Sequence, residues 1–379
     1  MNKSIAICTY NYFTTKYQVG SHNYAKAFAK LGYKVAFISN PISPLHYIFA
    51  NNDDLKKRDE IHSYGGVWED NIWYYVPKAI LTPQNKPILS SKYIFNNWYK
   101  FTTANLLDIL KENGFGEVDI LWIESPLFSF MLDVQKYDKS ILRLADFSKG
   151  FEQNWDMTYQ KEIEISKKVD KVVYTAKKLK EYYHKIDSSK MQYIPNGIDL
   201  ELVQKADKSM PQEFEGIKPP KVIYVGLIDY WFDVELVYKS AITYPNYSFI
   251  LIGDVKIDIQ KLEELTNVYL LGTIEHKDLG KYLANSQIGI IPFIKSDFVD
   301  SINPIKLYEY AAYGLKIVST SWKEVEELDD KFCISKTKEE FIKSLESSDV
   351  ENKLLVNNWL EKQDWTLKVK KAIKFENID

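Results

Sequence analysis

Lys306 and Glu309 lie three residues apart, directly after an Asn303-Pro304 break in the chain. Residues three apart share one face of a helix, so the ammonium and the carboxylate would point the same way. A helix N-terminus and a lysine attract phosphate, and a carboxylate accepts hydrogen bonds from sugar hydroxyls. Two interpretations follow: a nucleotide site at the edge of a parallel sheet, or an amphipathic helix with a solvated ion pair.

The elements around this pair predict an α/β domain. Gly314 would end the helix, and the apolar run Ile317-Val318 predicts a buried strand after it. Further strand patterns occur earlier, at 221–226, 248–253, 268–272 and 288–292, with helical patterns between them. Strands alternating with helices predict a parallel sheet that is covered on both faces. The first of these strands would deliver Gly226 into a loop.

The N-terminal half repeats this pattern. A strand at 4–8, a helix from Ser21 to Gly32 and a strand at 34–39 predict a βαβ unit, with Gly20 where the loop meets the helix. Gly20 either lets a substrate approach the backbone or only eases the entry into the helix. We therefore expect domains at 1–199 and 221–352, joined by a proline-containing linker at 200–220, and a charged helical tail at 353–379.

Composition narrows the function. A chain of 379 residues with 45% hydrophobic residues supports two cores, and a net charge of −3 argues against a nucleic-acid partner. Cys8 and Cys333 are isolated, which favours a reducing compartment. No secretion signal or run of 18 apolar residues is present, so we expect a cytoplasmic protein. The aromatic stretch 88–101 would be either a helix packed on the first domain or an amphipathic helix touching lipid.

Several motifs are absent from the sequence. It contains no DxD triplet, no GxxxxGK[ST], no GxGxxG and no ligand spacing among its five histidines. We therefore expect neither a metal site nor a cofactor.

The segment Ser301–Thr320 resembles the donor-binding segment of nucleotide-sugar glycosyltransferases of the GT-B fold, where N-P-x-K-x-x-E-Y-x-A-x-G precedes a V-V-S-T-like strand. Weaker similarity covers most of the chain, including the P-N-G-I-D run at 195–199. The resemblance implies two Rossmann-like domains with a cleft between them and a last helix that crosses back to the first domain. It implies donor-binding roles for Gly226, Phe293, Ser301, Asn303, Ile305, Lys306 and Glu309, and an acceptor-side loop at Gly20.

Asp146 is the candidate for a general base. Many retaining relatives carry two glutamates in the donor segment, but Ser301 stands where the first would be, which favours an inverting displacement. That reaction needs a carboxylate to take the proton of the acceptor hydroxyl. Asp146 ends a predicted strand, and its R-L-A-D context resembles that of the xanthan-pathway glucuronosyltransferase and its relatives, where an aspartate serves as base. Asp146 could instead be a cap, and Glu152 and Asp156 are rivals.

The sequence thus predicts a metal-independent, inverting glycosyltransferase of bacterial surface-polysaccharide biosynthesis. Its partners would be a nucleotide-sugar donor, UDP-linked by preference, and a glycan or lipid-linked acceptor. It would act in the cytoplasm, with peripheral contact to the inner face of the membrane left open. A retaining transferase, a nucleotide-sugar epimerase and a catalytically silent sugar-binding protein remain as alternatives.

Overall fold

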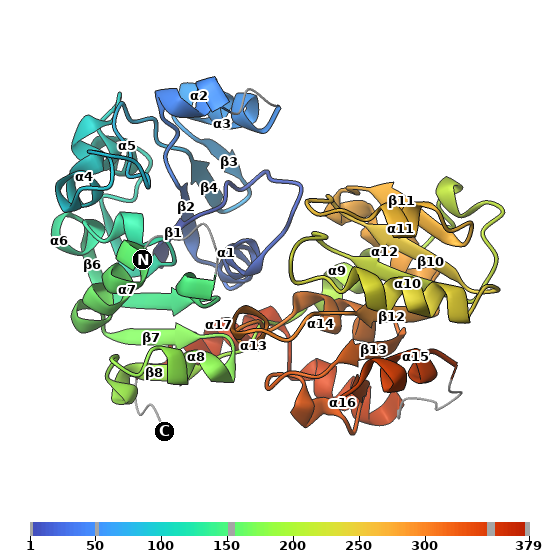
Figure 1. Cartoon of the computed structure of the whole chain (residues 1–379). Helices are drawn as coiled ribbons and strands as arrows, with labels where there is room; N and C mark the ends of the chain where they lie inside the picture. Colours follow the sequence, from blue (N-terminus) through green and yellow to red (C-terminus); the bar gives the residue numbers. More distant parts are fainter. Residues whose placement is uncertain (1–2, 50–52, 151–155, 347–352, 376–379) are drawn as a thin grey trace. The chain divides into compact units, whose positions relative to one another are not determined.

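The computed structural model describes residues 3–49, 53–150, 156–346 and 353–375. The chain forms two compact units, which are coloured by sequence in Figure 1. Unit 1 comprises Met1–Thr175, Leu179–Ile194 and Val369–Asp379, and unit 2 comprises Ala176–Lys178 and Pro195–Lys368.

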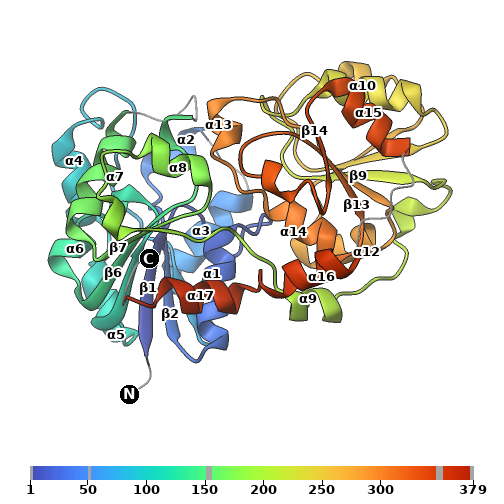
Figure 2. The ribbon, with the colours of Figure 1, turned by 90° about the horizontal axis from the view of Figure 1, so that it is seen from below.

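Unit 1 is built on an eight-stranded sheet in the order β3-β4-β2-β1-β5-β6-β7-β8, and only the β3–β4 pair is antiparallel. The strands are β1 Ser4–Thr9, β2 Lys34–Ser39, β3 Val67–Glu69, β4 Ile72–Tyr75, β5 Glu117–Ile123, β6 Lys136–Leu144, β7 Lys171–Tyr174 and β8 Met191–Tyr193. The α-helices are α1 Gly20–Lys30, α2 Pro44–Phe49, α3 Asp53–Ser63, α4 Lys92–Asn97, α5 Leu106–Glu112, α6 Met131–Val134, α7 Asp156–Lys168 and α8 Lys177–Tyr182, the first two residues of which belong to unit 2. Helices cover both faces of this sheet (Figure 2), which explains why every residue of β1 is buried.

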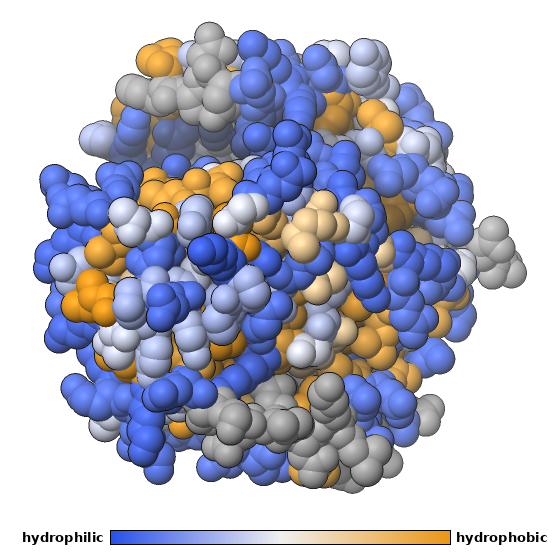
Figure 3. Space-filling view, turned by 90° about the vertical axis from the view of Figure 1, so that its right-hand side faces the viewer, coloured by the Kyte–Doolittle hydropathy of each residue, from blue (hydrophilic) through white to orange (hydrophobic). Residues whose placement is uncertain are grey.

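Unit 2 is built on a six-stranded parallel sheet in the order β11-β10-β9-β12-β13-β14. The strands are β9 Lys221–Val225, β10 Ser248–Ile252, β11 Val268–Gly272, β12 Ile288–Ile291, β13 Lys316–Thr320 and β14 Cys333–Ser335. The helices are α9 Leu200–Lys205, α10 Val234–Thr243, α11 Gln260–Glu263, α12 Leu279–Ala284, α13 Asp297–Asp300, α14 Ile305–Ala312, α15 Lys338–Glu346, α16 Lys353–Glu361 and α17 Trp365–Ala372. Figure 3 shows one face of the molecule, on which hydrophobic residues lie in separate groups among hydrophilic ones.

Both sheets contain the strand order of a doubly wound Rossmann-like fold. The order reverses between β1 and β5 in unit 1 and between β9 and β12 in unit 2. In such sheets, ligands bind outside the carboxyl ends of the strands at the point of reversal. Each unit therefore offers one such position.

The last helix, α17, contributes to both units, because the division falls between Lys368 and Val369. At its end in unit 1, the buried Lys171 of β7 donates a hydrogen bond to the carbonyl of Ala372 at 3.1 Å. Lys371 donates to the carbonyl of Tyr193 at 3.1 Å. These bonds tie the end of the chain to the β7–β8 edge of the unit 1 sheet.

Within the aromatic stretch 88–101, residues 92–101 form α4 and a 3-10 turn, η1 (Trp98–Phe101). Ile94, Phe95 and Trp98 are buried, and the Trp98 indole donates to the carbonyl of Leu127 at 2.7 Å. The stretch is therefore packed on unit 1, while Tyr93 remains exposed. In the part of the chain that the structure describes, no helix combines the length and the apolar character needed to cross a bilayer.

Candidate functional site

Gly226 marks the point of strand reversal in unit 2, directly after β9. Its φ of 147° lies in a region that side chains rarely adopt, and its backbone N–H donates to the carbonyl of Ile252 on β10 at 2.8 Å. A Cβ atom at this position would lie 2.9 Å from Nζ of Lys306. The structure therefore brings together Gly226 and Lys306, two of the predicted donor-binding residues.

The ammonium of Lys306 lies between two aromatic rings. Nζ is 4.9 Å from the ring centroid of Tyr224 on β9 and 4.8 Å from that of Phe293, just after β12. Both distances fit cation–π contacts. Burial lowers the pKa of Lys306 to about 8, and the charge of Glu309 acts in the opposite direction. None of the described carboxylates forms an ion pair with Lys306 within 4.0 Å, so an incoming anion would be its direct counter-charge.

Glu309 lies one helical turn after Lys306 on α14, which agrees with their predicted spacing. Its Oε1 is 3.1 Å from Nε2 of His276, in the 3-10 turn that precedes α12. The Glu309 side chain is 15% exposed. A carboxylate that is positioned by an imidazole and still reachable suits recognition of hydroxyl groups.

Asn303 and Ser301 are buried just before α14. The Asn303 carboxamide accepts from the backbone N–H of Asn196 at 2.9 Å and donates to Oε1 of Glu324 at 2.8 Å. The Ser301 hydroxyl donates to the carbonyl of Phe298 at 2.6 Å. These bonds hold the loop before α14 to the P-N-G run, while Ile305 begins α14 and is partly exposed.

Asp146 follows β6 in unit 1 and is partly buried. Burial raises the pKa of its carboxyl to about 6, with the positive charge of Arg143 acting against the shift and the negative charge of Glu124 adding to it. The sequence offered two other candidates for the base. Glu152 lies outside the described residues, and Asp156 is the first residue of α7.

A buried ion pair lies beside Asp146, and it was not predicted from the sequence. Nη1 of Arg143 on β6 is 3.1 Å from Oε1 of Glu124, and both side chains are under 10% exposed. Oε1 of Glu124 also accepts from the Trp122 indole at 3.0 Å, and Oε2 accepts from the Thr9 hydroxyl at 3.1 Å. The sequence does contain a signal for this pair: Glu124 ends one apolar run, at 119–124, and Arg143 lies inside the next, at 140–145.

Gly20 is joined to this pair. It begins α1, and a Cβ atom there would lie 2.3 Å from Nη2 of Arg143. The guanidinium also lies 5.1 Å from the ring centroid of Tyr24. Gly20 thus lies at the helix entry, as one of the two interpretations of the sequence expected, and its lack of a side chain leaves room for the buried cation.

Two candidate regions result, one in each unit. Unit 2 collects Gly226, Phe293, Lys306 and Glu309 at its strand reversal, and unit 1 collects Gly20, Arg143, Glu124 and Asp146 at its own. Among the residues described, no three histidine, cysteine, aspartate or glutamate side chains form a group suited to a metal ion.

The two halves of the chain match known domain families. Residues 7–175 match the N-terminal domain of the glucuronosyltransferase GumK, and residues 219–347 match the group 1 glycosyl transferases. A putative teichuronic acid biosynthesis glycosyltransferase, TuaH of Bacillus subtilis (strain 168), is 24% identical over 357 residues, covering 85% of this chain and 86% of the relative.

Solved structures share the fold over nearly the whole chain. Sucrose-phosphate synthase from Thermosynechococcus elongatus has a TM-score of 0.62 at 14% identity and covers 99% of this chain and 96% of its own. Anabaena HepE in complex with UDP and glucose has a TM-score of 0.65 at 11% identity and covers 98% of both chains. These similarities confirm the predicted α/β fold with two parallel-sheet domains.

Proposed function

We propose that this chain, which is a glycosyltransferase of the GT-B fold, transfers a sugar from a UDP-linked donor to a glycan or lipid-linked glycan acceptor. The proposed setting is bacterial surface-polysaccharide biosynthesis at the inner face of the cytoplasmic membrane. The teichuronic acid enzyme TuaH and the UDP complex of HepE support the setting and the nucleotide respectively.

The observation that carries the proposal is the environment of Lys306. Its ammonium lies against Gly226 and between Tyr224 and Phe293, at the carboxyl ends of β9 and β12. The donor diphosphate would lie there, because the glycine leaves room for the lysine ammonium at the carboxyl ends of the strands and the lysine supplies charge. Negative charge grows on the diphosphate as the sugar leaves, so a cation already in place stabilises the transition state. Glu309 would accept hydrogen bonds from the ribose.

Asp146 is proposed as the base. The acceptor hydroxyl oxygen would attack the anomeric carbon as the bond from that carbon to the diphosphate oxygen breaks, and the hydroxyl proton would pass to Asp146. A carboxyl with a pKa of about 6 is still largely ionised at neutral pH and is more basic than an ordinary aspartate. Direct attack inverts the anomeric configuration, so product NMR that shows retention would contradict this step.

A nucleotide panel tests the donor site without knowledge of the acceptor. UDP, GDP and TDP are added separately to the purified chain, and thermal unfolding is followed. A nucleotide at 100 times its dissociation constant adds about 2.7 kcal/mol to the free energy of unfolding. We expect the largest shift with UDP, and no comparable shift in Lys306→Ala.

The exposed Lys239→Ala, on α10, serves as the control and should behave as the wild type. No shift with any of the three nucleotides would contradict the donor assignment. A 2′-deoxy-UDP titration tests Glu309: loss of the ribose 2′-hydroxyl should weaken binding to the wild type more than to Glu309→Gln.

A further inference from the structure

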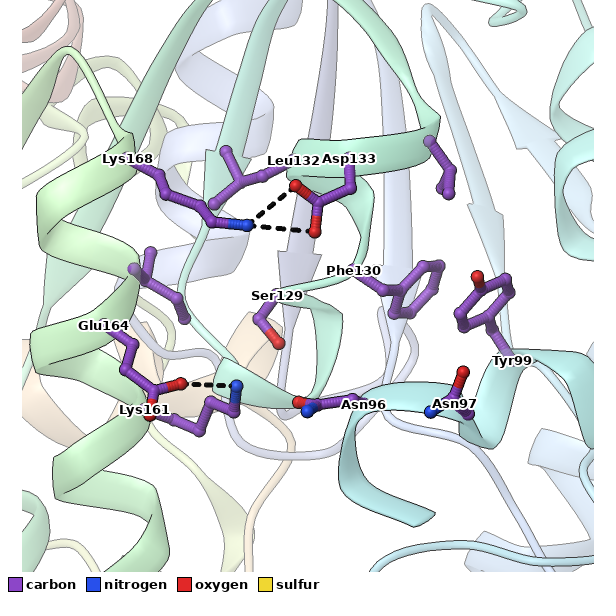
Figure 4. Close-up of a pocket in the computed structure, with 12 residues that line it drawn as sticks. Asn96, Asn97, Tyr99, Ser129, Phe130, Leu132, Asp133, Lys161, Glu164 and Lys168 are labelled. Atoms are coloured by element: carbon purple, nitrogen blue, oxygen red, sulfur yellow. Dashed lines mark hydrogen bonds and ion pairs between the residues drawn. The ribbon is translucent and has the colours of Figure 1, made fainter. Parts of the chain in front are cut away.

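Unit 1 contains a cavity of about 320 Å³ that has no part in the proposed reaction. Three segments line it: α4 with the following 3-10 turn, the segment from Ser129 to Val134 that contains α6, and the second half of α7 (Figure 4). The volume lies near the lower end of the range for small-molecule pockets, roughly 300–1,000 Å³.

The cavity shares no lining residue with the region around the proposed base. None of the described residues that line it is Gly20, Glu124, Arg143 or Asp146. Asp133, on its wall, precedes β6, whereas Asp146 follows β6. The cavity is therefore a site with its own set of residues.

The charges that line the cavity are paired with one another. Lys161 binds Glu164 at 2.6 Å, and Lys168 binds both carboxylate oxygens of Asp133 at 2.7 and 3.0 Å, as the dashed lines in Figure 4 show. Two lysines and two carboxylates leave the lining without net charge. The cavity therefore has no excess positive charge to favour a phosphate or a uronate.

Uncharged polar groups are available beside these pairs. The Asn96 carboxamide and the Ser129 hydroxyl line the cavity and form no hydrogen bond to any of the described residues. In Figure 4, Asn96 lies on the side opposite the Lys168–Asp133 pair, and Ser129 lies between them. Together they offer donors and acceptors to a ligand that carries several hydroxyl groups.

An apolar surface completes the lining. The rings of Tyr99 and Phe130 are stacked with centroids 4.0 Å apart and planes 9° apart, and Leu132 and Ile165 are buried nearby. Stacking fixes the two rings in place, so they present a rigid apolar wall. The C–H face of a sugar ring packs well on such a wall through dispersion contacts, while its hydroxyls point to polar groups.

We propose that this cavity is a second, non-catalytic glycan-binding site that takes an uncharged hexose or N-acetylhexosamine unit. This proposal rests on the proposed function, because that reaction is what brings a glycan to the protein. A site whose lining is separate from the residues around the base could hold a distal unit of an extended acceptor, although binding itself requires no turnover.

Binding of defined oligosaccharides tests the site. Maltotetraose and triacetylchitotriose are the neutral probes, trigalacturonate is the charged probe, and each is titrated into the full chain by calorimetry. We expect at least one neutral probe to bind more tightly than trigalacturonate. Ser129→Leu, which fills the cavity with an apolar side chain, should weaken that binding at least tenfold, or about 1.4 kcal/mol.

Two further variants make the test specific. Asn96→Ala changes an exposed side chain and should weaken the same probe several-fold without affecting folding. Tyr93→Ala alters an exposed aromatic residue of α4 that does not line the cavity, and it should bind as the wild type does. Binding of the neutral probe by Ser129→Leu and Asn96→Ala as tight as by the wild type would overturn the proposal. So would a preference for trigalacturonate, or no binding of either neutral probe at millimolar concentration.

UDP titration of the same variants keeps the two proposals apart. We expect unchanged UDP affinity in Ser129→Leu and Asn96→Ala. Loss of oligosaccharide binding with intact UDP binding locates the defect in the cavity, whereas absence of UDP binding in the wild type would contradict the donor assignment alone.

Discussion

The two units share a strand order but differ in the chemistry at the point of reversal. In unit 1, Arg143 and Glu124 neutralise each other in a buried pair beside Asp146. In unit 2, Lys306 lies between aromatic rings with no ion pair to a described carboxylate. One topology thus carries a closed charge network in the first unit and a cation open to an anion in the second. This contrast supports the proposal that the second unit binds the phosphates of the donor.

Burial disfavours the charged form of the key group in each unit, with opposite consequences. The pKa of Asp146 is raised to about 6, which makes the carboxylate a stronger base. The pKa of Lys306 is lowered to about 8, so an anion that binds it would restore the charged form. The difference suits a proton acceptor in unit 1 and a diphosphate site in unit 2.

The largest expected effect comes from Asp146→Asn, which keeps the shape of the side chain and removes its basicity. Turnover should fall by roughly 10²–10⁴-fold, because proton transfer to a positioned base contributes about that factor. Asp138→Asn changes an exposed aspartate on the same strand and should leave the rate unchanged. Near-normal turnover in Asp146→Asn would move the base to another residue, with Glu152 the next candidate.

Arg143→Leu should cause the largest loss of stability. It leaves the Glu124 carboxylate buried without its counter-charge, a change that typically costs about 3–5 kcal/mol in urea unfolding. Lys139→Leu is the matched control on β6, because its ion pair with Asp170 at 3.8 Å is exposed to solvent and should contribute under about 1 kcal/mol. Equal losses of unfolding free energy in the two variants would show that the buried ion pair stabilises unit 1 no more than the exposed one does.

The pH dependence of turnover and of UDP affinity should distinguish Asp146 from Lys306. Below about pH 6, Asp146 becomes protonated and cannot accept a proton, so kcat/KM should fall on the acid side. Above about pH 8, Lys306 loses its charge, so UDP affinity should fall roughly tenfold from pH 7 to pH 9. In Asp146→Asn, the alkaline loss of UDP affinity should persist. UDP affinity that is constant across this range would contradict the role of Lys306.

Removal of divalent metal should have the smallest effect. We expect turnover to be unchanged by EDTA, because Lys306 and backbone N–H groups would meet the charge of the diphosphate. Loss of turnover with EDTA and its recovery with Mn²⁺ would show that the diphosphate is held differently.

The sequence predicted the elements better than the contacts between them. The Asn303-Pro304 break, the helix and the stop at Gly314 were predicted, and the structure has α14 at Ile305–Ala312 followed by β13. These features depend on local propensities and capping, which neighbouring residues determine. The enclosure of Lys306 by Tyr224 and Phe293 could not be predicted, because it depends on how three separate elements pack.

The Arg143–Glu124 pair shows the same limit. Glu124 directly follows β5 and Arg143 lies on β6, the neighbouring strand of the unit 1 sheet. Their distance of 3.1 Å follows from the register of β5 against β6, which no local pattern specifies. Asn303 illustrates a second limit. A motif identifies its position, whereas its buried bonds to Asn196 and Glu324 are visible only in the structure.

The proposed roles of the two units, donor binding in unit 2 and the base in unit 1, are tested most directly by UDP titration. The proteins compared are the wild type, Asp146→Asn and Lys306→Ala. Calorimetry at neutral pH measures the dissociation constant of each protein. Our account predicts that Asp146→Asn binds UDP as the wild type does, while Lys306→Ala loses about 1.5–3 kcal/mol, the contribution of a charge-assisted contact to phosphate. Unchanged affinity in Lys306→Ala, or a comparable loss in Asp146→Asn, would contradict it.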